Sequence, residues 1–488
     1  MKNYFFPHLE WEALRQPVTF SKIDQNDRLP KKPKEIKISR DEEYNLKAFL
    51  EFEITSSDEE NIWKKHVVKG SVKKPFYINS SSHGISYTLE SVLIGSVNVI
   101  KISNEIIKNE GRAELFFNAL KIEYSSTRKG THFVEWYLNG PNEPLFWDKT
   151  EREQKINFIR KRSDSENTEK DSIKNSTIDS DFAADCMWIE LPKLQFLIEK
   201  VPNEFGPKWS SNIAIEFREE WGGIPSREDR VLIEEVCSFI FGRQLLSIGY
   251  TIFDKTECLV EAYCHNPWGR NAKSFCSKVS YPPIKIIFPP SKIKQVIFQL
   301  LPKYLELSNS LCLTEALWNI WVSREMPIGT NLPILAAALE SIMNGWFKSK
   351  SKTHGAYLPK NDFLDLVETD FDLIRIKLEQ YFEPKDNYKV EKIIDKLKRG
   401  NDFGVMEKYR IFFDEINLKI EPHEWRAIIE RHKFVHGEAR FNNTDWDKVM
   451  VHVNTYETLL NKVLLKLLGY SGSYIDRSVQ GLTEKQLM

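Results

Sequence analysis

The pattern of hydrophobic and polar positions changes its period once along the chain, near residue 290. Before that point short runs alternate apolar and polar residues, as in 46–54, where every second residue from Leu46 is apolar. After it, apolar residues recur every three or four positions, which is typical of amphipathic helices. The chain is therefore predicted to be a multidomain α+β protein, with an antiparallel β-rich N-terminal half resembling a sandwich or barrel and an α-helical C-terminal half.

The period-two runs predict strands at 46–54, 87–93, 97–102, 113–117, 121–124, 133–138, 187–198, 213–221, 245–253, 257–263 and 284–288, with one short helix at 232–242. The period-3.6 runs predict helices at 292–307, 313–325, 333–347, 361–382, 388–399, 405–416, 422–435 and 445–468.

Composition shifts divide the chain further. Residues 1–40 are rich in Pro, Lys and Asp and are interpreted as an extended arm. A β-rich recognition or regulatory domain is expected at 41–290, with a mobile polar loop at about 160–181, because that loop has almost nothing to bury. Pro289-Pro290 marks the boundary, a helical domain follows at 291–470, and 471–488 is expected to be a tail.

One predicted helix ends in residues that bear chemistry. Pro422 suits its first turn, and Gly437 suits the residue just past its end. At about 100° per residue one face collects a mixed set of apolar residues and histidines, namely Trp425, Ile428, Ile429, His432, Val435 and His436. Arg431 falls roughly 100° round from the histidines, at the rim of that face.

The run Arg431-His432-Lys433-Phe434-Val435-His436 resembles the R-x4-H motif of the HEPN family. The resemblance implies a helical bundle that cleaves RNA without a metal or other cofactor, often as a homodimer whose two motifs face each other. Arg426-x5-His432 fits a looser version of the motif. An Ala-Leu-Glu stretch at Ala338-Leu339-Glu340, together with a β-rich N-terminal half, is similar to the ApeA-like branch of this family.

The residue types suit that chemistry. Histidine titrates near neutral pH, so His436 is a candidate to take a proton from a ribose 2′-OH or to give one to the leaving oxygen. Arg431, always charged and fork-shaped, is a candidate to clamp the scissile phosphate. His432 is expected to orient the phosphate or the other two residues.

Supporting roles are assigned to residues around this motif. Glu340 either anchors Arg431 and shapes the site or is a semi-buried acid that pairs helices. Lysines at or near the motif and after the helix at 333–347 are candidates to contact RNA phosphates, or belong to a solvated surface; they are Lys433, Lys348, Lys350 and Lys352, with His354 beside them.

Two other interpretations of the motif stay open. In the first, both histidines are hydrogen-bonded core residues and Arg431 pairs with an acidic neighbour such as Glu424 or Glu430. In the second, His432 and His436 are half of a metal site, completed by His423 and Glu424. The only other cluster that suggests a metal is Cys258, Cys264, His265 and Cys276, interpreted as buried apolar cysteines. The main prediction is a site without a metal.

Bulk charge does not decide the function. Lys and Arg number 69 against 70 acidic residues, so any RNA site must be a local basic patch. Six cysteines without a C-x-x-C pair indicate reduced thiols, and no run of 18 apolar residues occurs. A cytoplasmic protein without a membrane segment is expected.

These observations and the resemblance predict an RNA-cleaving effector of the ApeA-like HEPN type. The resemblance further implies antiviral defence by growth arrest of the infected cell, with the β-rich half sensing a phage-derived trigger. The alternative is a noncatalytic HEPN-type binding or scaffold protein that recruits another effector.

Overall fold

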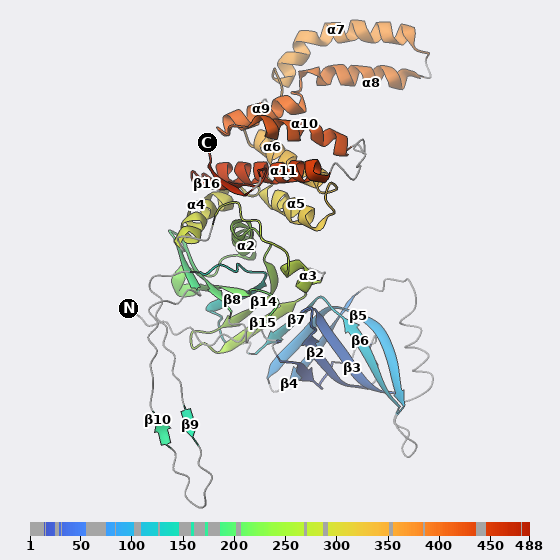
Figure 1. The fold of residues 1–488 in the computed structure, drawn as a ribbon. Coiled ribbons are helices and arrows are strands. Elements are labelled where there is room, and N and C mark those ends of the chain that lie inside the picture. The colour runs from blue at the N-terminus through green and yellow to red at the C-terminus, as the bar shows by residue number, and fades with distance from the viewer. Residues whose placement is uncertain are drawn as a thin grey trace, which may run out of the picture. The chain divides into compact units, whose positions relative to one another are not determined.

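The computed structural model of the chain describes residues 14, 16–24, 29–30, 32–54, 75–82, 84–101, 109–124, 127–145, 158–160, 171–173, 186–201, 206–267, 271–285, 291–350, 355–383, 386–435, 446–479 and 481–488. It is a mixed α/β structure with a large antiparallel sheet in the N-terminal half and helices in the C-terminal half (Figure 1). The fold class predicted at this level is confirmed.

The chain divides into two compact units. The β unit comprises Met1–Arg230, Arg243–Tyr281 and Ile286–Phe298, and the helical unit comprises Val231–Gly242, Pro282–Lys285 and Gln299–Met488. The expected boundary at Pro289-Pro290 lies outside the described residues.

In the described part of the β unit, thirteen strands form one sheet in which every ladder is antiparallel. The strand order is β1-β2-β3-β6-β5-β7-β15-β14-β8-β13-β12-β11, and β4 pairs with β5 beside this path. The strands are β1 (Val18–Phe20), β2 (Pro33–Arg40), β3 (Leu46–Ile54), β4 (Phe76–Ser82), β5 (Ile85–Lys101), β6 (Asn109–Phe116), β7 (Ala119–Glu123), β8 (His132–Leu138), β11 (Cys186–Leu191), β12 (Leu194–Lys200), β13 (Ile213–Arg218), β14 (Leu246–Phe253) and β15 (Leu259–His265).

The predicted strand at 46–54 is confirmed residue for residue, but four other expectations on strands need correction. The strand expected at 213–221 ends at Arg218, and Glu219–Trp221 form a 3-10 helix. The two strands expected at 87–93 and 97–102 are one long strand, β5, with an irregularity between Ile94 and Val97. The single strand expected at 187–198 is the hairpin β11–β12. Ile284 and Lys285 are not in a strand, and the rest of that predicted run lies outside the described residues.

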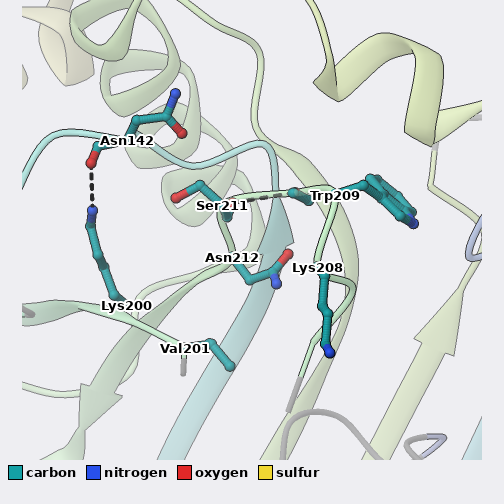
Figure 2. Close-up of a pocket in the computed structure, with 8 residues that line it drawn as sticks. Asn142, Lys200, Val201, Lys208, Trp209, Ser211 and Asn212 are labelled. Carbon is teal, nitrogen blue, oxygen red and sulfur yellow. Dashed lines mark hydrogen bonds between the residues drawn. The ribbon is translucent and has the colours of Figure 1, made fainter. Parts of the chain in front are cut away.

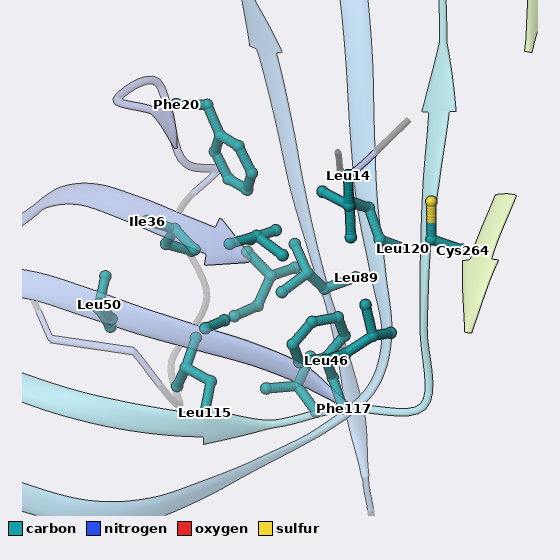
Figure 3. Close-up of a cluster of buried hydrophobic side chains, with 14 of the residues drawn as sticks. Leu14, Phe20, Ile36, Leu46, Leu50, Leu89, Leu115, Phe117, Leu120 and Cys264 are labelled. Carbon is teal, nitrogen blue, oxygen red and sulfur yellow. The ribbon is translucent and has the colours of Figure 1, made fainter. Parts of the chain in front are cut away.

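The N-terminal segment contributes to the core of the β unit. β2 pairs with both β1 and β3, and its Ile36 and Ile38 are fully buried because alternate side chains of a strand point to one face. Figure 3 shows Ile36 packed in one hydrophobic cluster with Leu50, Leu89 and Leu115. Where described, residues 18–20 and 33–40 therefore belong to the sheet and differ from the extended arm expected there.

Two short segments fall at or inside the loop expected at about 160–181. β9 (Phe158–Arg160) pairs antiparallel with β10 (Asp171–Ile173). The residues between them lie outside the described part of the chain.

The eight predicted C-terminal helices are confirmed to within three residues at each end. They are α4 (Ser291–Leu307), α5 (Leu313–Glu325), α6 (Leu332–Lys350), α7 (Lys360–Tyr381), α8 (Asn387–Lys398), α9 (Val405–Glu415), α10 (Pro422–Val435) and α11 (Trp446–Leu467). The described structure also contains α2 (Arg227–Phe241), which begins five residues before the helix expected there, and the short α3 (Ala272–Cys276). Among the helices described, none combines the length and the apolar character that crossing a membrane requires.

Helix α6 lies at the centre of the helical unit, where it contacts α5, α9, α10 and α11. Its Leu335, Leu339 and Ile342 are buried, because they recur on one side of the helix at spacings of three and four. Ala338 is fully buried as well, which lets a neighbouring helix approach closely. Residues on α6 and α10 are thereby held next to each other.

The C-terminal segment is not a free tail. β16 (Ser473–Asp476) and β17 (Thr483–Gln486) form an antiparallel hairpin. Tyr474 and Leu487 are buried, and Ile475 N donates a hydrogen bond to Pro283 O of the same unit. The described residues of 471–488 thus fold onto the helical unit, which differs from the expected tail.

Candidate functional site

Helix α10 carries the predicted motif, and its bounds are those predicted from the sequence. Its buried face consists of Glu424, Ala427, Ile428 and Arg431, which are spaced i, i+3, i+4 and i+7. Ile429 is 55% exposed, although it was assigned to the buried face. The face is therefore rotated from the predicted one, and Arg431 lies on it instead of at its rim.

The rotation follows from the partner that Glu424 finds on α11. Both carboxylate oxygens of Glu424 accept hydrogen bonds from Lys462 Nζ, at 2.7 and 2.8 Å, and both side chains are almost completely buried. Glu424 Oε2 also accepts from Glu421 N at 2.8 Å, which caps the first turn of α10. Because a paired charge can be buried, Glu424 occupies a core position that its residue type does not suggest.

The Arg431 side chain is 4% exposed and has two partners from two other helices. Its Nη2 forms an ion pair with Glu340 Oε1 of α6 at 2.5 Å. Its Nη1 donates a hydrogen bond to Tyr409 Oη of α9 at 2.7 Å, and the guanidinium lies 5.2 Å from the centre of the Tyr409 ring. The structure thus places Glu340 against Arg431, and the sequence-based pairing of Arg431 with Glu424 or Glu430 is wrong.

Exposure differs sharply across this ion pair. The Glu340 side chain is 40% exposed, whereas that of Arg431 is 4% exposed. The carboxylate therefore reaches solvent while it holds a guanidinium that does not.

Two tyrosines complete the surroundings of the guanidinium. Burial raises the pKa of Tyr409 and of Tyr456 on α11, so both phenols stay neutral near pH 7. Burial lowers the pKa of Arg431, but its neighbours Tyr409, Tyr456 and Glu340 outweigh burial and raise that pKa overall. Arg431 is thus a permanently charged group in a closed polar cluster. Tyr456 Oη is buried beside Arg431 and Tyr409.

The other predicted site residues are placed in part. His432 and Lys433 belong by their backbone to the last turn of α10, while His436, Lys352 and His354 lie outside the described residues. Lys348 and Lys350 were expected to follow the helix at 333–347, but they are exposed residues in the last turn of α6, which runs on to Lys350. The positive charge at that helix end is favourable because it faces the negative end of the helix dipole.

Two of the residues that the metal interpretation requires, His423 and Glu424, have other partners. Glu424 is held by Lys462, and His423 Nε2 lies 3.3 Å from Ser478 Oγ. Glu430, which the other interpretation pairs with Arg431, is instead paired with His452, at 2.8 Å between Oε2 and Nε2. Within the described ranges no group of three metal-ligating side chains occurs. Of the cysteine cluster, Cys264 and Cys276 are buried and Cys258 is exposed.

The β unit contains a polar hollow of about 410 Å³. Figure 2 shows Lys200, Trp209 and Asn212 around it, with Lys200 Nζ donating a hydrogen bond of 3.0 Å to Asn142 O. Partial burial lowers the pKa of Lys200. These residues come from β12 and from loops far apart in sequence, and no motif joins them, so the sequence analysis missed the hollow.

Comparison with known proteins finds no significant match to a family model, to a curated protein or to a solved structure. The HEPN assignment therefore depends on the motif and its setting.

Proposed function

We propose that this chain is a metal-independent endoribonuclease of the HEPN type, acting at the C-terminal end of α10. The observation that supports this most is the guanidinium of Arg431, held one turn from that end by the half-exposed carboxylate of Glu340 and by Tyr409. A charged fork in a dry setting interacts with a phosphate more strongly than one in water. The helical C-terminal half would then be a HEPN-type bundle.

In the proposed reaction a ribose 2′-oxygen attacks the adjacent phosphorus and the bond to the 5′-oxygen breaks. The 2′-hydroxyl proton leaves to a base, and the 5′-oxygen receives a proton, so the products carry a 2′,3′-cyclic phosphate and a 5′-hydroxyl. His436 is proposed to carry one of these protons, and His432 is proposed to orient the phosphate.

The role of Arg431 requires its partner to change. In the described conformation Glu340 occupies Nη2 of the guanidinium. A phosphodiester oxygen would replace the Glu340 carboxylate there, because both are anionic oxygens that suit the same donor. We propose that neighbouring phosphates are contacted by lysines near this site, namely Lys348, Lys350, Lys352 and Lys433. The side chains of Lys348 and Lys350 are exposed, as such contacts require.

We assign the β unit the role of a sensor, in a cytoplasmic protein that arrests the growth of phage-infected cells. This assignment depends on the resemblance to ApeA-like proteins. The polar hollow lined by Lys200, Trp209 and Asn212 is proposed to hold part of a trigger. RNA is the proposed substrate and a second copy of the chain the proposed partner.

The proposal is tested with the purified full-length chain, incubated with RNA in EDTA. We expect RNA fragments ending in a 2′,3′-cyclic phosphate, with Arg431→Ala and His436→Ala inactive. Arg410→Ala is the matched control, because Arg410 is an exposed arginine on α9 beside the same cluster. Melting curves identify any variant that has lost its fold. Equal cleavage by the wild type, Arg431→Ala and His436→Ala would exclude this site.

The burial of Arg431 favours one second candidate, a noncatalytic scaffold in which the arginine only joins helices. A guanidinium that is 4% exposed and has two partners satisfies such a role without any substrate. The scaffold predicts that Arg431→Ala impairs function only through folding and that His436→Ala has no effect. It also predicts another protein that co-purifies in a fixed ratio.

A further inference from the structure

Helix α7 has almost no tertiary support. It is 22 residues long, and none of its side chains is buried. Long helices in folded proteins are stabilised mainly by packing of an apolar face, since helix propensity alone gives marginal stability in water. Among the residues that the structure describes, α7 therefore lacks the fully buried face that a helix of this length normally has.

Its apolar residues form two seams, and only one of them is covered. The first seam is half-buried and contains Phe363, Val367, Phe371, Ile374 and Leu378. Figure 1 shows α8 running beside α7 in the opposite direction, and Val390 and Ile394 of α8 are buried. The second seam is open: Leu366, Leu373 and Ile376 are 71%, 54% and 51% exposed. The apolar arc of α7 is thus wider than one neighbouring helix covers.

The two helices form a hairpin whose ends are joined at its base. Asn401, after α8, accepts a hydrogen bond from Leu358 N and donates one to Leu358 O, before α7. Tyr357 N donates to Asn401 O, and Arg375 of α7 forms an ion pair with Glu391 of α8. These contacts fix α7 against α8, so the exposed residues of the second seam lie on a helix whose position in the hairpin is defined.

Charge is divided between the helices of the hairpin. α7 carries six acidic and three basic side chains, whereas α8 carries four lysines and two acidic side chains. Asp365 and Asp372 are exposed beside the open seam of α7, two turns apart. Lys392 and Lys396 are exposed one turn apart on α8. One hairpin thus presents an acidic and a basic stripe that complement each other.

We propose that the α7–α8 hairpin is a dimerisation element whose partner is the same hairpin of a second copy. In this arrangement α7 packs its open seam against α8 of the partner, which gives a four-helix bundle. Self-complementary stripes are what a two-fold symmetric interface requires, because each residue pair then occurs twice. Packing α7 on α7 would instead bring the aspartates of the two copies together. The inference does not depend on RNA cleavage.

The first test is the mass of the full-length protein in solution by sedimentation at micromolar concentration. We expect a dimer for the wild type and a monomer for Leu366→Glu/Leu373→Glu. Val279→Glu is the control, because Val279 is 75% exposed in the β unit, and this variant should remain dimeric. A monomeric wild type, or a double variant that still dimerises, would overturn the proposal.

Exchanging charges between the two helices tests whether α7 of one copy packs against α8 of the other. Asp365→Lys/Asp372→Lys and Lys392→Glu/Lys396→Glu should each weaken the dimer at least tenfold, and the dimer should return when all four changes are combined in one chain. Failure of the combined variant to dimerise would exclude α7 packing on the partner's α8. Both experiments measure the mass of the protein in solution and not its activity. The inference therefore stands if the protein dimerises in this way but does not cleave RNA.

Discussion

At the scale of single residues, the structure explains why a charged side chain can occupy the core. Arg431 loses almost all contact with water and receives a carboxylate and a phenol in exchange. The sequence-based analysis centred the buried face of α10 on apolar residues and histidines, so it included Ile429 and left out Glu424 and Arg431. Their burial depends on Lys462, Glu340 and Tyr409, which are distant in sequence, so no local pattern reveals it.

Removing the arginine should destabilise the helical unit. Arg431→Ala leaves the buried Tyr409 hydroxyl without its donor and Glu340 without its cation, at a cost of roughly 1–3 kcal/mol in the free energy of unfolding. Urea denaturation measures this change. Arg426→Ala, at an exposed position of the same helix, should stay within about 0.5 kcal/mol of the wild type. Equal effects of the two substitutions would show that the Arg431 contacts contribute nothing.

Replacing Glu340 by glutamine removes its negative charge and keeps the shape of its side chain. Glu340→Gln keeps an oxygen near Arg431 Nη2 but removes the negative charge that competes with a phosphate. We expect a lower KM for RNA than in the wild type, because the guanidinium is released more easily. Glu368→Gln, an exposed glutamate of α7, is the control for the loss of one surface charge. An unchanged KM would argue against phosphate binding at Arg431.

At the scale of elements, the bounds of the helices were predictable, whereas the buried face of α10 was not. The bounds of α5 and α10 follow from local signals, since a 3.6-residue period, a proline and a glycine act within a few residues. From the same local signals β5 was predicted as two strands, and β11 and β12 were predicted as one. The alternating pattern does not distinguish an irregularity within a strand from a tight turn between two strands. The hydrogen-bonded order of the strands depends on contacts between distant segments.

The ion pair that joins α10 to α11 gives a prediction at this scale. Lys462→Met leaves the carboxylate of Glu424 buried without its cation, and breaking such a pair costs about 3–5 kcal/mol in the free energy of unfolding. Adding Glu424→Gln to this variant should recover part of the loss, because the uncompensated charge is then gone. Denaturation midpoints of the single and double variants report the difference. Strictly additive losses would contradict a direct coupling.

At the scale of the whole molecule, the change of period near residue 290 predicted a β-rich half and a helical half, and both are present. The sequence did not reveal that residues 231–242 belong with the helices, because such membership depends on packing and not on order along the chain. The open seam of α7 consists of leucine and isoleucine, which also form buried helix faces. The sequence alone therefore did not show that this seam is exposed.

The central claim, RNA cleavage at the end of α10, is tested most directly in bacterial cells that express the chain, with and without phage challenge. Total RNA and growth are followed for the wild type, His436→Ala and Arg431→Ala, with matched protein levels and with His423→Ala, an exposed histidine of the same helix, as the control. The account predicts growth arrest with RNA fragments for the wild type and for His423→Ala only. Identical RNA and growth in all four strains would contradict it.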